Sequence, residues 1–358
     1  MRIVGAHLDD AIGYPAGIER LANSEDWWPL TGRGDVWSTT WARDGALYSV
    51  SDDTNGFGNA CASNLAIHRI TGDMLPDIHG ETINCMSAYG ADGELGADRA
   101  SWKANGLTCI DGVLYLSVSR HHYMNDNFPI QQTWDASIVK SEDGGQTWSE
   151  TPRLGQSMFP GHTFSTPFFV QYGQDGAGDA DGARTYVYAV SSDGVWNNGS
   201  TMTLGRVRRD RIGRLDPRDW EFVNGYDKAR QPVWGARQDT ALYTFRAPGR
   251  TSMTGIHYIA PLGLYIMPQW HYPCLEPFER PRSWQVSRWD FYQAPVPWGP
   301  WTLFHSQEFD PQGWYNPCIP GKFIGDNGRT LWIFTAGDFG TQAYYYLHMI
   351  RMTLEVED

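Results

Sequence analysis

Two aspartates, Asp35 and Asp53, are spaced symmetrically about a hairpin signal. Asp44-Gly45 lies between two β-like runs, and each of the two aspartates is nine residues from Asp44. Asp-Gly favours a tight turn, and antiparallel pairing brings positions equally distant from that turn side by side. Two neighbouring carboxyl groups cannot both ionise easily, so one of them keeps a proton. A proton donor beside a carboxylate that attacks or activates water is what glycoside hydrolysis requires. The spacing therefore predicts Asp35 and Asp53 as catalytic residues.

Other polar and aromatic residues fall on the same expected face. If the first strand of a repeat lines a channel, the start of that strand and the end of the second strand lie at one end of the channel. We expect the residues at these positions to bind substrate: Trp37, Asp52, Lys103, Asn105, Arg120, His121, His122, His162, Trp270, His271, Tyr315 and Asn316. Successive residues on a regular strand point to opposite sides, so at most one of His121 and His122 faces the channel. The alternatives are that Asp35 caps a strand, that 52–56 is a polar loop, and that 120–123 is a surface loop.

A turn followed by an aliphatic–aromatic pair recurs five times along the chain. The pairs are Leu47-Tyr48, Leu114-Tyr115, Val187-Tyr188, Leu264-Tyr265 and Leu331-Trp332, at intervals of 67, 73, 77 and 67 residues. Each pair has one β-like run before it and at least one after it. Three or four antiparallel strands repeated at this spacing are typical of propeller blades. The sequence predicts an all-β fold, a five-bladed β-propeller with about 70 residues per blade.

The two chain ends are expected to share the last blade. No evident fourth strand follows Leu354, and the N-terminal run RIVGAHL has a pattern that would supply one. We expect the N-terminal strand to close the ring within a single domain, residues 1–358. The expected blades cover 33–75, 101–153, 157–224, 234–306, and 312–358 together with 1–8.

Composition favours a sugar ligand and disfavours polyanions. Aromatic residues make up 14% of the 358 residues, with 17 Trp and 18 Tyr, and the formal net charge is −13. Such a charge repels nucleic acid and anionic lipid, and no apolar window approaches the roughly 18 residues of a membrane helix. We expect an oligo- or polysaccharide partner, no nucleic acid and no membrane. The N-terminal segment lacks the apolar core of a signal peptide. The compartment stays open, with an extracellular location favoured for a mature chain.

Cysteine usage argues against a metal centre. The five cysteines, Cys61, Cys85, Cys109, Cys274 and Cys318, are odd in number, widely spaced and without a CxxC pair. This spacing disfavours a zinc site and a dense disulfide framework. Cys109 and Cys318 are expected in inner strands, where a thiol behaves as a small apolar group. We expect no metal ligands and no cofactor, apart from an optional calcium ion in the central channel.

Two stretches resemble known propeller families. The segment SEDGGQTW, 141–148, matches the S-x-D-x-G-x-T-W Asp-box of sialidase-type propellers, which implies that Asp143 caps a turn. The stretch DVWSTTWARDGALYSVSDD, 35–53, resembles the first blade of DUF4185-type propellers, whose superfamily includes bacterial endo-D-arabinanases. Similarity continues at 168–175, 186–188, 315–317 and 328–332.

The second resemblance implies a five-bladed, retaining glycosidase. Asp35 and Asp53 match the two essential aspartates of those relatives in spacing and strand position. The relatives carry Gly before the second aspartate, whereas this chain has Asp52. The resemblance therefore leaves open whether Asp52 or Asp53 points inward.

Two other functions also fit the sequence. A propeller-type polysaccharide lyase needs a cation to neutralise a uronate and a Tyr or His to take its C5 proton, which Arg120, His121, His122 and Tyr123 could provide. A non-catalytic sugar-binding propeller would use the aromatic residues alone. We favour glycoside hydrolysis, because it uses the paired aspartates. The sugar, the linkage and the choice between endo and exo cleavage stay open.

Overall fold

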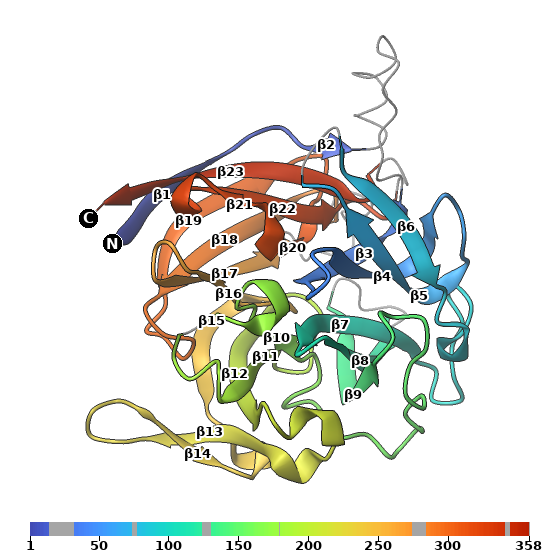
Figure 1. Ribbon diagram of the computed structural model, residues 1–358, viewed down its shortest axis with the longest axis horizontal. Coiled ribbons are helices and arrows are strands. Elements are labelled where there is room, and N and C mark those ends of the chain that lie inside the picture. Colours follow the sequence, from blue (N-terminus) through green and yellow to red (C-terminus); the bar gives the residue numbers. More distant parts are fainter. Residues whose placement is uncertain are drawn as a thin grey trace.

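The structure is a computed structural model that describes residues 1–13, 32–73, 77–123, 130–178, 180–273, 284–340 and 344–357. Five small sheets are arranged in a ring, and the first strand of each sheet lies nearest the centre (Figure 1). The predicted fold class, an all-β five-bladed propeller, is confirmed. Cys274 lies outside the described residues.

The blades follow one another along the chain. The first contains β3 (Gly32–Trp41), β4 (Leu47–Phe57), β5 (Ser63–Thr71) and β6 (His79–Asn84). The second contains β7 (Ser101–Ile110), β8 (Val113–His122) and β9 (Gln132–Ser141). The third contains β10 (Phe168–Phe169), β11 (Tyr186–Ser192), β12 (Gly199–Arg208), β13 (Trp220–Tyr226), β14 (Pro232–Gly235) and β15 (Tyr243–Thr251). The fourth contains β16 (His257–Ile259), β17 (Leu264–His271), β18 (Ser287–Ala294) and β19 (Thr302–Phe309).

The fifth blade unites the two ends of the chain. It contains β20 (Tyr315–Cys318), β21 (Ile324–Gly325), β22 (Thr330–Ala336), β23 (His348–Glu357), β1 (Arg2–Leu8) and β2 (Ile12–Gly13). The described helices are single 3₁₀ turns in loops: η1 (Ser87–Tyr89), η2 (Gln174–Gly176), η3 (Ile212–Arg214), η4 (Pro217–Asp219), η5 (Gln238–Thr240), η8 (Gly321–Phe323) and η9 (Asp326–Gly328).

The ring is closed as predicted. β1 pairs antiparallel with β23, with Arg2 opposite Glu357 and Leu8 opposite Met352. The Ile3 amide also donates to the side-chain oxygen of Gln293 in the fourth blade, at 2.8 Å. The N-terminal strand therefore joins the last blade to its neighbour as well as completing its sheet.

The boundary between the third and fourth blades differs from the sequence expectation. Residues from 234 onward were assigned to the fourth blade, but β14 pairs with β13 and β15 pairs with β12. The fourth sheet begins only at His257. A blade count based on an average spacing assumes equal blades, whereas the third blade carries two additional outer strands.

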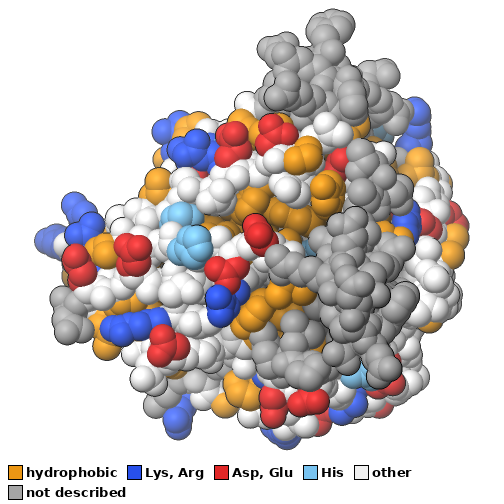
Figure 2. Space-filling view, turned by 90° about the horizontal axis from the view of Figure 1, so that it is seen from above, with side chains coloured by type: hydrophobic (Ala, Val, Ile, Leu, Met, Phe, Trp, Pro, Cys, Tyr) orange, Lys and Arg blue, Asp and Glu red, His pale blue; other side chains and the backbone are white. Residues whose placement is uncertain are grey.

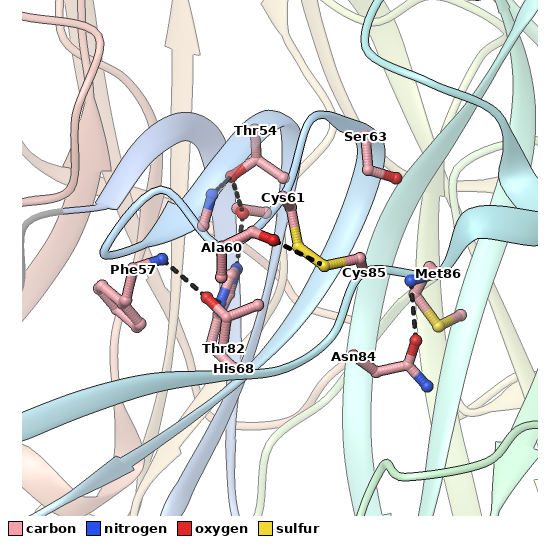
Figure 3. Close-up of a disulfide and its surroundings, with 12 residues drawn as sticks. Thr54, Phe57, Ala60, Cys61, Ser63, His68, Thr82, Asn84, Cys85 and Met86 are labelled. Atoms are coloured by element: carbon pink, nitrogen blue, oxygen red, sulfur yellow. Dashed lines mark hydrogen bonds between the residues drawn. A yellow bond between two sulfur atoms is a disulfide. The ribbon is translucent and has the colours of Figure 1, made fainter.

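Two local features show how the outer turns are held. In the turn after β9, Asp143 accepts hydrogen bonds from the Thr147 amide at 2.9 Å and the Thr147 hydroxyl at 2.6 Å. The carboxylate therefore caps this turn, as the resemblance implied. Cys61 and Cys85 form a disulfide that ties the loop after β4 to the end of β6 (Figure 3). A dense disulfide framework was not expected, and this single pairing was not predicted.

Candidate active site

The hairpin of β3 and β4 brings three aspartates together. Asp35 pairs with Asp52 across the ladder, and irregular register lies on both sides of Asp35. The backbone has positive φ at Val36 (68°), Trp37 (42°) and Asp53 (42°). Such conformations are uncommon outside glycine and interrupt the alternation of side chains along a strand. Consecutive residues Asp52 and Asp53 thus line one cavity together with Asp35.

The cavity lies at the mouth of the central channel and has a volume of about 160 Å³. Carboxyl, ammonium, imidazole, amide and aromatic groups all line it. The lining residues are Asp35, Asp52, Asp53, Lys103, His121, Tyr123, Gln131, Trp196, Phe339 and Tyr345. Below the cavity, the channel between the inner strands has a free volume of about 10 Å³. This volume is about enough for one water molecule.

Asp35 has the environment of a proton donor. Burial raises the pKa of its carboxyl to about 7, against the charge of Lys103, with Asp53 raising it further. The Tyr315 hydroxyl donates to Asp35 Oδ2 at 2.8 Å. Asp35 Oδ1 is buried and has no hydrogen-bond partner among the residues that the structure describes. Asp35 therefore keeps one carboxyl oxygen without a hydrogen bond beside the cavity that it lines.

Two donors contact the Asp53 carboxyl. Its Oδ1 forms an ion pair with the Lys103 ammonium, and its Oδ2 accepts from the Tyr123 hydroxyl at 3.1 Å. Burial would lower the pKa of Lys103, but the surrounding carboxylates, Asp53 foremost, raise it well above its usual value. Asp53 is the more exposed of the pair, with 22% of its side chain accessible against 6% for Lys103. Asp53 is thus bound by an ammonium and a hydroxyl and is partly exposed.

Asp52 is more deeply placed than Asp53. Its Oδ1 accepts from the Ala104 amide at 3.0 Å, and the residue is buried. Burial raises its pKa well above the usual value, partly offset by Lys103. Asp52 and Asp53 therefore both face the cavity. The sequence left open which of the two points inward; both do, and their surroundings differ.

His121 is neutral in this site. Burial and the Lys103 charge lower its pKa to about 3, and its Nε2 contacts the Gln131 side-chain oxygen. Its ring lies 4.9 Å from that of Tyr123 and 6.0 Å from that of Trp196. A neutral imidazole with these contacts is suited to hydrogen bonding and to forming a wall, not to carrying charge.

An aromatic wall faces the carboxylates. Trp196 lies 5.3 Å from the Tyr315 ring and 4.7 Å from the Trp270 ring, between ring centroids. Of these three, Trp196 lines the cavity, while Trp270 is fully buried behind it. Edge-to-face packing of this kind fixes the position of the Trp196 ring. Flat aromatic surfaces next to polar groups suit a sugar ring, which has apolar faces and a polar rim.

The remaining expected residues lie away from the cavity lining. Trp37 packs against Phe57 and His68 in the core, and Asn105 donates to Ser117 and Ser119. Asn316 lines the narrow channel below.

Three histidines that were expected to bind substrate also lie outside the cavity lining. His122 packs 6.1 Å from Trp134, and His162 Nδ1 lies 2.8 Å from the Thr133 carbonyl oxygen. His271 contacts Asp290 at 3.7 Å, and burial lowers its pKa to about 4.

Arg120 is engaged in holding a loop. Its guanidinium binds both oxygens of Asp98, at 2.9 and 2.7 Å, and lies 4.4 Å from the centre of the Trp102 ring. Only 3% of its side chain is exposed. The cation that reaches the cavity is instead Lys103.

Sequence reasoning missed several lining residues. Gln131, Trp196, Phe339 and Tyr345 come from loops or strand starts in other blades, and Tyr123 was considered only for the lyase alternative. Tyr123 follows β8 directly, so strand-end position was an available signal. Trp196 and Tyr345 lie in the loops that precede β12 and β23, where no periodicity predicts side-chain direction.

Metal binding finds no support in side-chain clusters. Within the described ranges, no three or more His, Cys, Asp or Glu side chains are arranged to hold a metal ion. The free thiols of Cys109 and Cys318 are buried in β7 and β20, the inner strands in which they were expected. Calcium in the channel stays a prediction. No helix in the described part of the chain is long and apolar enough to span a membrane.

Comparisons define the class of fold. No protein-family model and no curated protein matches the sequence. A "putative hydrolase" from Bacteroides ovatus is similar in structure, with a TM-score of 0.54 and 14% identity over 96% of this chain and 93% of that chain. The GH43 protein BlXynB from Bacillus licheniformis, solved as a variant, gives a TM-score of 0.50 and 14% identity over 92% of this chain and 54% of that chain. The fold is thus similar to that of these two solved proteins, and at 14% identity the likeness extends to the fold alone.

Proposed function

We propose that the chain is a glycoside hydrolase that cleaves an oligo- or polysaccharide in the cavity between Asp35 and Asp53. The observation that carries this proposal is the contrast between the two carboxyls. The pKa of Asp35 is raised to about 7 by burial, whereas Asp53 is bound to an ammonium and a hydroxyl. Acid-assisted glycosidic cleavage requires a carboxyl that keeps its proton beside a second carboxyl that can attack the sugar or activate water.

Asp35 is the proton donor in this proposal. Its unpartnered Oδ1 would protonate the oxygen of the glycosidic bond as the bond to the anomeric carbon breaks. Tyr315 orients the carboxyl through the other oxygen. After departure of the leaving group, the same oxygen would accept a proton from water.

Asp53 is the second catalytic carboxylate. The resemblance to retaining arabinanases supports a role as nucleophile, in which an Asp53 oxygen bonds to the anomeric carbon and water later displaces it. Lys103 and Tyr123 position this carboxylate. The lyase alternative loses its arginine, because Arg120 is bound to Asp98 and does not line the cavity.

The test is a pair of single substitutions measured on a panel of polysaccharides. We expect Asp35→Asn and Asp53→Asn each to abolish the release of reducing ends from any polymer that the wild type cleaves. Asp227→Asn is the matched control, because Asp227 accepts turn hydrogen bonds far along the chain in the β13–β14 hairpin. If both cavity variants kept wild-type turnover while remaining folded, the proposal would be wrong.

A further inference from the structure

A second and larger depression lies on the same face of the disc. It is a groove of about 610 Å³ between the fourth and fifth blades. Its walls come from the end of β19, the link between β1 and β2, and the segments just before β20 and β23. Figure 2 shows the molecule from the edge of the disc, and hydrophobic side chains gather beside acidic ones on that side.

The groove and the candidate active site are back to back. Trp314 lines the groove, and its neighbour Tyr315 donates to Asp35. Tyr344 lines the groove, and its neighbour Tyr345 lines the cavity. Two pairs of consecutive residues thus separate the two spaces. A chain of sugars longer than the cavity can hold would reach the groove over this short partition.

The lining of the groove has the chemistry of a sugar-binding surface. Aromatic and aliphatic side chains, including Phe309 and Leu8, lie beside the polar side chains of Gln307, Glu308 and Gln312. The rings of Trp314 and Tyr344 pack edge to face at 5.3 Å, which fixes that wall. Apolar patches next to amide and carboxylate groups match the apolar faces and hydroxyl rims of pyranose and furanose rings.

The charges of the groove restrict its ligand. Asp9, Asp10, Glu308 and Asp310 line it, and none of the described lining residues is Lys or Arg. Asp9 forms an ion pair with Arg351, outside the lining, at 2.6 Å. The adjacent cavity has three aspartates and one lysine, whose ammonium is paired with Asp53. An anionic sugar would be repelled along this path, whereas a neutral one would not.

We propose that the groove between the fourth and fifth blades binds the part of a neutral polysaccharide that extends beyond the cleaved bond. The substrate of the site is therefore a polymer of uncharged sugars that occupies the groove and the cavity together. This inference rests on the proposed function for its description of the cavity. It adds a binding surface that the paired aspartates do not require.

The test fills the groove without touching the cavity. Ala11, which is half-buried in the groove wall, is replaced by tryptophan. Ala229→Trp is the matched control, because Ala229 is exposed in the β13–β14 turn. Gln312→Ala is a second variant that removes a polar contact without adding bulk. For a wild type that cleaves a neutral polymer, we expect Ala11→Trp to raise KM on the polymer at least tenfold, and to leave activity on a chromogenic glycoside of a single sugar unchanged.

A binding measurement separates this inference from the hydrolase proposal. Asp35→Asn protein is run in native gels cast with neutral arabinan, xylan or glucan, or with an acidic pectin. We expect retardation in at least one neutral polymer, loss of that retardation with Ala11→Trp, a smaller loss with Gln312→Ala, and none with Ala229→Trp. Equal retardation of the Ala11→Trp protein, preference for pectin, or no retardation in any neutral gel would overturn the groove proposal. A protein that is retarded as expected but whose wild type cleaves nothing would overturn only the hydrolase.

Discussion

Asp35 lies opposite Asp52 in the β3–β4 ladder, while the left-handed backbone of Asp53 turns the next carboxylate into the same cavity. Three acidic side chains therefore share the single ammonium of Lys103. That ammonium pairs directly with Asp53, and burial raises the pKa of Asp35 and of Asp52. This division of charge leads to the predictions that follow.

Activity should decline on the alkaline side of neutrality. The pKa of Asp35 is about 7, so above this pH the proton donor is lost and kcat/KM should fall about tenfold per pH unit. The Tyr315 hydroxyl lowers this pKa by hydrogen bonding to Asp35. In Tyr315→Phe the decline should therefore move to higher pH. A pH–rate profile identical in both proteins would exclude Asp35 as the acid.

Asp35→Asn should be more stable than the wild type at neutral and higher pH. The folded-state pKa, about 7, lies above the ordinary value of 3.8, so wild-type stability falls as pH rises between these values. An amide has no such penalty. We expect no difference near pH 4 and a melting temperature higher by on the order of 5 °C at pH 8. Thermal unfolding followed by circular dichroism at both values measures this, and an equal difference at both would count against it.

Lys103→Met should move the alkaline decline in activity to higher pH. The Lys103 charge lowers the pKa of Asp35. Removal of this charge should therefore shift the pH at which activity falls upward by roughly one pH unit or more. The groups that face the ammonium are Asp53, Tyr123, Asp52 and Asp35. The maximal rate should also fall, because Asp53 loses its partner. Lys103→Arg keeps the charge, so its alkaline decline should occur at the wild-type pH. An unchanged pH of decline in Lys103→Met would contradict this account.

Removal of the disulfide should destabilise the first blade. Cys61 and Cys85 are separated by 24 residues, and closing a loop of this size contributes about 3 kcal/mol. The double variant Cys61→Ser/Cys85→Ser should therefore melt at a lower temperature than the oxidised protein. A reductant should lower the melting temperature of the wild type and have no effect on the double variant. Identical melting of oxidised wild type and double variant would show that the crosslink contributes nothing.

Truncation of side chains in β1 should destabilise the protein only on the buried side of the strand. Ile3 is 1% exposed, whereas its neighbour Val4 is 40% exposed. Ile3→Ala should cost about 2–5 kcal/mol of unfolding free energy, while Val4→Ala on the outer side should cost well under 1 kcal/mol. Urea unfolding of both variants makes the comparison. Similar losses in the two would mean that β1 is not packed as described.

Much of the propeller could be predicted because local sequence patterns determine its strands and hairpins. Hairpin signals such as Asp44-Gly45 and a recurring aliphatic–aromatic pair require only a neighbouring strand to take effect. Counting residues across one hairpin placed Asp35 opposite Asp53, whereas the ladder pairs it with Asp52, because the register shifts on both sides of Asp35. The left-handed backbone at Asp53 did not follow, since nothing in the local pattern requires it.

The rest of the site depends on contacts between distant segments. Arg120 had the residue type for binding an anion, but its partner Asp98 is 22 residues away and is known only once the loop is folded. Trp196 and Tyr345 reach the cavity from the third and fifth blades, through loops without periodicity. Even the blade boundary at 234 was misplaced, because an average spacing cannot anticipate an extra pair of strands.

The pairing of β1 with β23 has a consequence for how the protein is made. β1 finds its partner strand only when residues 348–357 have been synthesised. Until then, the nascent chain is an open arc whose fourth blade also lacks the contact between Ile3 and Gln293. Closure of the ring therefore waits for the part of the chain that forms β23, and the unfinished arc is the stage at which a chaperone has most to protect.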